Sequence, residues 1–202
     1  MPRAGLSRAA VVDLAQAAAD DGGPGGFDSL TLATVAARAG VAVPSLYKHV
    51  DGLPDLRREV ALRAVEDFTA TVRDVIAEGT SSDALRTAGR AIRTYALQRP
   101  ARYAAVQEAP ALGDLPDGRL SAASAQAVVV LADALRGALP GRPADRSPAA
   151  DTDAEVHLVR VVRAAVHGFV DLELRGGFGM PQDRDVSFEH LLDVLARGLG
   201  VD

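Results

Sequence analysis

The 202-residue chain contains no cysteine, and aromatic residues make up only 4% of it. The lack of cysteine excludes disulfides, thiol nucleophiles and cysteine-ligated zinc or iron–sulfur sites. Because aromatic side chains are scarce, the core must be built mainly from Ala, Val and Leu, within a hydrophobic content of 48%. The length is enough for one or two domains with such a core.

Long apolar runs are also lacking. The longest continuous one, 127–132, is far shorter than the roughly 20 residues that cross a bilayer. The N-terminus leads into an amphipathic pattern and does not resemble the apolar core of a signal peptide. We therefore expect a cytoplasmic protein that has no membrane partner.

A surplus of basic residues is missing as well. The chain has 22 basic and 27 acidic residues, a formal net charge of −5, and Lys48 is its one lysine. Residues 1–60 hold six basic and seven acidic groups. This balance argues against bulk affinity for nucleic acid, so any DNA binding must depend on a few placed contacts and show a shallow salt dependence.

Between Gly- and Pro-rich breaks, the apolar residues repeat with helical spacing. No stretch alternates strictly between apolar and polar residues, so the sequence predicts an all-α fold. The run 127–131 has strand propensity but lies inside a long helical pattern, and we interpret it as helix. The predicted helices are 7–20, capped by Ser7, then 32–39, 44–50, 54–78, 82–98, 100–108, 121–139, 153–175 and 188–199.

Residues 31–50 have the proportions of a helix-turn-helix, with Gly40 ending the first helix. In the second helix, Leu46 and Val50 fall on one apolar face. The opposite face carries groups suited to phosphate oxygens and base edges, namely Pro44, Ser45 and Lys48, flanked by Tyr47 and His49. Spacing alone leaves open a helical hairpin with a merely solvated face.

The segment TLATVAARAGVAVPSLYKHV (31–50) closely resembles the DNA-binding core of tetracycline-repressor family regulators, and the helix 7–20 fits the first helix of that module. The resemblance implies that 44–50 is a recognition helix in the major groove of a double-stranded DNA operator. It also implies that Tyr47 and His49 contact phosphates and that Thr31 offers its hydroxyl and N–H to a phosphate. The residues it places facing the bases are Val43, Pro44, Ser45 and Lys48.

The segment departs from the family pattern at several positions. Ala42 replaces a common capping serine, at a typical cost of about 1 kcal/mol. Leu53 stands where relatives carry a phosphate-contacting lysine, and Ala33 and Thr34 stand where they often carry Arg or Lys. These losses support the alternative of an all-α small-molecule-binding protein or enzyme that has lost DNA binding. A structural interaction module is a third possibility.

Residues 54–202 show no catalytic constellation, so we expect no enzyme activity and no cofactor. His167 and Asp171 are four residues apart on one predicted helix and could supply two metal ligands. The alternative is a helix side-chain hydrogen bond or a histidine satisfied in the core. No third ligand is evident, so we expect no metal site.

The predicted helix 153–175 is apolar around most of its circumference, and 188–199 repeats the pattern. A helix that is apolar all round is buried on both sides. Paired by a two-fold axis, the two helices of each subunit would form a four-helix interface; the alternative is a well-buried monomer core. The predicted homodimer residues are Val161, Val162, Ala165, Phe188, Leu191, Leu192 and Leu195.

A second segment, VHGFVDLE (166–173) followed by Gly176-Gly177-Phe178, resembles a subgroup of tetracycline-repressor C-terminal domains marked by Trp-His-Gly, with Val166 in place of the tryptophan. In the family this domain binds a small effector and couples its binding to the spacing of the DNA-reading heads. Gly168 inside a helix suggests close packing or a pocket wall. Aromatics on four helices could converge around the effector: Phe68, Tyr95, Tyr103 and Phe169.

Together these patterns predict a DNA-binding domain at 1–53 and an effector-binding and dimerisation domain at 54–202. The predicted function is a ligand-responsive transcriptional regulator, a repressor that binds a palindromic operator as a homodimer and is released by a small-molecule effector of unknown identity.

Overall fold

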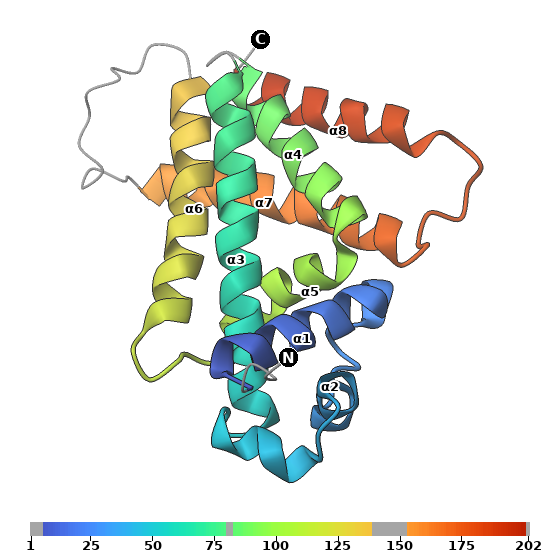
Figure 1. The fold of residues 1–202 in the computed structure, drawn as a ribbon. Coiled ribbons are helices and arrows are strands. Elements are labelled where there is room, and N and C mark those ends of the chain that lie inside the picture. Colours follow the sequence, from blue (N-terminus) through green and yellow to red (C-terminus); the bar gives the residue numbers. More distant parts are fainter. Residues whose placement is uncertain (1–5, 80–82, 139–152, 201–202) are drawn as a thin grey trace. The chain divides into compact units, whose positions relative to one another are not determined.

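The computed structural model describes residues 6–79, 83–138 and 153–200. Within these ranges the regular elements are helices, and no strand is present, which confirms the all-α prediction (Figure 1). The apolar run 127–131 lies within a helix, as predicted. The elements are α1 (Arg8–Asp21), η1 (Gly23–Gly25), α2 (Leu32–Ala39), η2 (Val43–Lys48), α3 (Leu53–Glu78), α4 (Ala84–Gln98), α5 (Pro100–Glu108), η4 (Ala109–Ala111), α6 (Arg119–Ala138), α7 (Asp153–Leu174) and α8 (Arg184–Gly198).

Two of the predicted helices differ from the structure in type or by more than two residues at one end. The segment predicted as a helix at 44–50 is the 3₁₀ turn η2. The last helix begins at Arg184, four residues before the predicted start, because the Asp183 side chain accepts a hydrogen bond from the backbone N–H of Asp185 and caps that end.

The chain forms two compact units. The first unit contains Met1–Phe68 and Gln98–Ala125, and the second contains Thr69–Leu97 and Gln126–Asp202. The first unit extends beyond residue 53 because side chains of α5 bind to its earlier helices: Arg102 pairs with Asp20 of α1 at 2.8 Å. The division of roles between 1–53 and 54–202 stays a prediction.

In the first unit, a hydroxyl side chain caps the N-terminus of each of two helices. Ser7 Oγ accepts a hydrogen bond from Ala10 N, and Thr31 Oγ1 accepts one from Thr34 N, as the sequence predicts for N-caps. Gly40 ends α2 in the left-handed conformation, with φ 67°, which glycine adopts without a Cβ penalty. The buried side chains of this unit are mostly aliphatic, and its buried aromatic rings are Phe27, Phe68 and Tyr103. The aliphatic ones include Val11, Val12, Ala15, Val35, Leu46 and Leu56.

In the second unit, α8 packs against α4 through a close apolar contact and through ion pairs (Figure 1). At the centre of the contact, a Cβ on Gly89 would lie 2.5 Å from a methyl carbon of Leu192, so glycine permits the close approach. Beside it, the α4 arginines Arg86 and Arg90 pair with Asp193 and Glu189 of α8. No helix in the described part is long and apolar enough to span a membrane.

Candidate DNA-binding surface and effector pocket

The turn η2 has the two-faced character that its sequence predicts. Leu46 is fully buried and Val50 is buried beside it. On the other side Tyr47 is 58% exposed, and Pro44 and Lys48 are exposed as well. The remaining predicted DNA contacts in this element, Val43, Ser45 and His49, are half-buried.

The beginning of η2 is weakly held. Ala42 precedes η2, and no side chain caps the turn. This is predicted by the presence of alanine where related sequences carry a capping serine. The backbone supplies the local bonds instead: Ser45 N donates to Ala42 O at 2.9 Å and His49 N donates to Leu46 O at 2.8 Å. A 3₁₀ turn has poorer hydrogen-bond geometry than an α-helix, so the position of η2 depends on contacts made outside it.

Thr31 is exposed at the N-terminus of α2, where a helix dipole favours negative charge. Its hydroxyl serves as the cap and lies 2.7 Å from Thr34 Oγ1. The hydroxyls of Thr31 and Thr34 therefore lie together at this helix end.

Most arginines of the first 60 residues act inside the first unit. Arg8 pairs with Asp55, Arg38 with Asp21, and Arg57 with Glu108. Arg58 donates to the carbonyl oxygen of Leu112 at 3.0 Å. The sequence does not reveal these pairings, because the partners lie 17 to 54 positions away.

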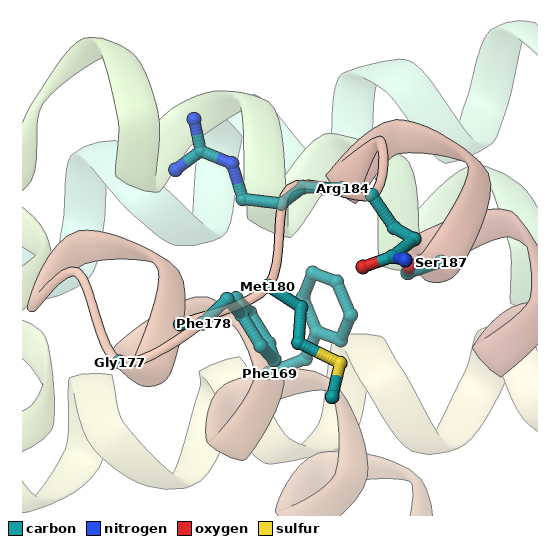
Figure 2. A pocket seen from close by; sticks show the side chains of 8 residues that line it. Phe169, Gly177, Phe178, Met180, Arg184 and Ser187 are labelled. Carbon is teal, nitrogen blue, oxygen red and sulfur yellow. The ribbon is translucent and has the colours of Figure 1, made fainter.

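Phe169 lines a pocket of about 370 Å³ where α7 ends and α8 begins. Its ring centroid lies 4.7 Å from that of Phe178 and 5.1 Å from that of Phe188. Figure 2 shows the Phe169 and Phe178 rings close to Met180, whereas the guanidinium of Arg184 extends away from them. The other lining residues are Gly177, Gly179, Gln182 and Ser187.

The other three predicted pocket aromatics are not among the residues that line this pocket. Tyr95 is buried in the second unit, whereas Phe68 and Tyr103 belong to the first unit, with ring centroids 6.5 Å apart. That the four aromatics surround one cavity stays a prediction. A second pocket, of about 420 Å³, contains none of them; residues from α3 and α6 line it, among them Arg73, Ile76, Val130 and Asp133.

The imidazole of His167 is neutral at physiological pH, because burial, and then the charge of Arg163, lowers its pKa to about 4. Its predicted helix neighbour Asp171 accepts a hydrogen bond from Arg175 at 2.7 Å. The described residues contain no cluster of three or more His, Cys, Asp or Glu side chains that could hold a metal ion.

The predicted dimer residues divide into two sets. Val162, Phe188 and Leu192 are buried inside the subunit, so they build its own core. Val161 is 55% exposed, and Ala165, Leu191 and Leu195 are half-buried. Leu172 and Val194, which the sequence analysis did not select, are 47% and 62% exposed on the same two helices. The exposed apolar residues of α7 and α8 therefore include Leu172 and Val194 besides Val161. The dimer role of the predicted residues stays a prediction.

Similarity to known proteins extends over most of the chain. The uncharacterized HTH-type transcriptional regulator Rv0681 of Mycobacterium tuberculosis is 33% identical over 174 residues, which are 86% of this chain and 74% of that protein. The uncharacterized HTH-type transcriptional regulator YobS of Bacillus subtilis is 29% identical over 182 residues, covering 90% and 86%.

Solved structures share the fold. The crystal structure of SCO4313 superposes with a TM-score of 0.70 at 27% identity, covering 93% of this chain and 94% of that one. A TetR transcriptional regulator from Rhodococcus sp. RHA1 gives a TM-score of 0.56 at 18% identity, covering 92% of each chain. A family model described as the tetracyclin repressor-like, C-terminal domain matches residues 85–195. The chain therefore belongs to the tetracycline-repressor family of helix-turn-helix transcriptional regulators.

Proposed function

We propose that the protein is a homodimeric repressor that binds a palindromic operator in double-stranded DNA and is released by a small-molecule effector. The observation that supports this best is the exposed pair Tyr47 and Lys48, which the buried side chains of Leu46 and Val50 hold outward. A merely solvated hairpin would need no phenol and ammonium side by side on its exposed surface.

In this proposal Tyr47, His49 and Thr31 contact phosphates, whereas Val43, Pro44, Ser45 and Lys48 face the bases. Phosphate contacts position a protein on DNA and base contacts give specificity. Few phosphates are neutralised, because the arginines Arg8, Arg38 and Arg57 pair with carboxylates of the protein. We therefore expect affinity to fall only gently with salt.

The dimer would have two states, and in one of them the two η2 turns lie about 34–36 Å apart, as successive major grooves require. The effector would bind the other state more tightly and so release the DNA. The pocket lined by Phe169 and Phe178 is a candidate effector site. Its volume, about 370 Å³, falls within the range typical of small-molecule sites.

The first test is selection of bound DNA from genomic fragments, followed by titration of the selected operator with the double variant Tyr47→Ala, Lys48→Ala. We expect affinity to fall about 100-fold, or about 2.7 kcal/mol, because the phenol and ammonium contacts of the turn are lost. Fluorescence anisotropy of labelled operator measures the change.

A matched control removes an exposed apolar side chain and a cation elsewhere, with Leu97→Ala and Arg73→Ala. This control should bind the operator like the wild type. If the Tyr47, Lys48 variant is folded and also binds like the wild type, the assignment of the recognition element is wrong. If selection yields no operator but the protein binds a small molecule tightly, the function is that of an all-α ligand-binding protein.

The homodimer has its own test at Gly168 on α7. A Cβ built on this exposed glycine meets no atom within 4 Å, so packing within the subunit does not require glycine, although glycine costs about 1 kcal/mol relative to alanine in a helix. Close approach of a second copy would explain it. We expect Gly168→Leu to leave the subunit folded and to weaken dimerisation at least about tenfold in sedimentation experiments.

Thr94→Leu, which adds a leucine to the exposed side of α4, is the control for added apolar surface and should leave the dimer intact. A Gly168→Leu protein that dimerises like the wild type would show that a second copy does not approach α7 closely at Gly168.

A further inference from the structure

The guanidinium of Arg8, the first residue of α1, lies beside the end of η2. Its Nη1 donates to the backbone oxygen of His49 at 2.9 Å and to Asp55 Oδ2 at 2.9 Å. Its Nη2 donates to Asp55 Oδ1 at 2.8 Å and to Glu59 Oε1 at 2.9 Å, and Nε donates to Glu59 Oε1 at 3.2 Å. These bonds occupy all five N–H groups of the guanidinium.

Asp55 also binds the segment that follows η2. Its Oδ2 accepts a hydrogen bond from the backbone N–H of Asp51 at 2.9 Å. The chain directly after Tyr47 and Lys48 is therefore held at two backbone groups, the carbonyl of His49 and the N–H of Asp51, by the two partners of one bidentate ion pair.

The two carboxylates that bind Arg8 are buried. Asp55 and Glu59 are only 7% and 8% exposed, and the hydrogen bonds from Arg8 lower the pKa of Asp55, so it stays ionised. Glu59 Oε1 also accepts from Arg119 Nη2 at 3.1 Å. Two carboxylates are thus matched by two arginines.

The turn needs this support. It has no side-chain cap at its beginning, and Leu46 and Val50 fix only its inner face. The direction in which Tyr47 and Lys48 point depends on the backbone that leaves the turn at 49–51, which is where Arg8 and Asp55 bind.

We propose that Arg8 is a positioning residue for DNA recognition, which fixes the backbone carrying Tyr47 and Lys48 through His49 and Asp55. Arg8 acts through the turn and makes no contact with DNA of its own. This inference rests on the proposed DNA-binding function.

The test uses Arg8→Lys in the full-length chain. Lysine keeps the positive charge beside Asp55 and Glu59, but its single ammonium has three N–H groups and no fork. It cannot make the five bonds of the guanidinium, and we expect the bond to His49 to be lost. The matched control is Arg63→Lys. Arg63 joins the same two helices, α3 and α1, through Asp13 and the carbonyl of Ala9, and makes no contact that the structure records with 43–51.

The first readout is amide hydrogen exchange in the absence of DNA. We expect amide exchange at His49, Val50 and Asp51 to become about tenfold faster in Arg8→Lys and to stay unchanged in Arg63→Lys. The two variants are compared under conditions that give them equal free energy of unfolding, so that a difference in exchange reports local opening. Exchange at these amides that matches the wild type would overturn the positioning role, whether or not the protein binds DNA.

The second readout is affinity for the selected operator. Arg8→Lys should weaken binding about tenfold in the wild-type background, but less than about threefold in a Lys48→Ala background, because residues that act through one element are not additive. Equal losses in both backgrounds would mean that Arg8 acts on DNA independently and would overturn the inference. If the wild type selects no DNA, the proposed function fails, and exchange alone decides whether Arg8 holds the turn.

Discussion

Replacing Gly26 with alanine is expected to destabilise the first unit by about 3 kcal/mol, the upper end of the range for overpacking. A Cβ at this position would lie 1.9 Å from the carbonyl oxygen of Ala19 in α1 and 2.9 Å from the Cα of Gly22. These are backbone atoms of a helix end and a turn, so no side-chain rotation can relieve the clash. The turn after α1 must move away from the helix, which strains the path of the chain to the adjacent buried Phe27.

Gly25→Ala is the matched control, because Gly25 is the preceding residue of the same turn and a Cβ there meets nothing within 4 Å. We expect Gly25→Ala to change the free energy of unfolding by less than about 1 kcal/mol, the usual scale of a compatible glycine-to-alanine change. Urea denaturation at fixed protein concentration measures both. Equal stability of the two variants would contradict the close packing of this turn on α1.

Local signals in the sequence predict the helix ends and faces of the first unit well. Ser7 and Thr31 cap their helices as predicted, and Leu46 and Val50 are buried behind Tyr47. Each of these features depends on residues within about four positions of one another. A hydroxyl residue just before an apolar repeat predicts the start of a helix. The angle between successive side chains predicts which of them face inward.

Features that depend on distant partners could not be predicted. In the sequence Arg8 is only one of the six basic groups of residues 1–60, and its acceptors lie 41 to 51 residues away. The apolar pattern of the last helix does not show which residues face the subunit's own core, and Phe188 and Leu192 are buried there. Periodicity identifies an apolar helix face, whereas the element that covers it is set by tertiary packing.

The pocket at Phe169 shows the same limit. Phe169 is predicted as a pocket residue because aromatic residues are scarce and it lies on a helix, whereas Phe178 and Met180, which also line the pocket, lie in the loop before α8. A loop has no periodicity from which its side chains could be assigned to a cavity.

Two arginines of α4 form ion pairs with glutamates that have similar hydrogen-bond geometry but different burial. Comparing them shows how burial changes the contribution of an ion pair to stability. Arg93 donates two hydrogen bonds to Glu173 of α7, both at 2.7 Å, and Arg90 donates two to Glu189 of α8, at 2.9 and 2.7 Å. The pairs differ in burial. The side chains of Arg93 and Glu173 are 14% and 5% exposed, whereas those of Arg90 and Glu189 are 46% and 47% exposed.

Glu173→Ala is therefore expected to lower the free energy of unfolding by about 3 kcal/mol, at the low end of the cost of breaking a buried pair, because Asp185 still accepts from Arg93 at 2.5 Å. Glu189→Ala should cost at most about 1 kcal/mol, as exposed pairs do. Urea denaturation at fixed protein concentration measures both differences.

The double variant Arg93→Leu, Glu173→Leu separates the loss of attraction from the cost of an unpaired charge. Replacing both partners of a buried pair with apolar residues is often neutral, so this variant should recover most of the stability that Glu173→Ala loses. The cation–π contact of Arg93 with Phe188, 5.0 Å from guanidinium carbon to ring centroid, would be replaced by apolar packing. If Glu173→Ala costs no more than Glu189→Ala, or if the double variant is the least stable of the three, burial does not set the strength of these pairs.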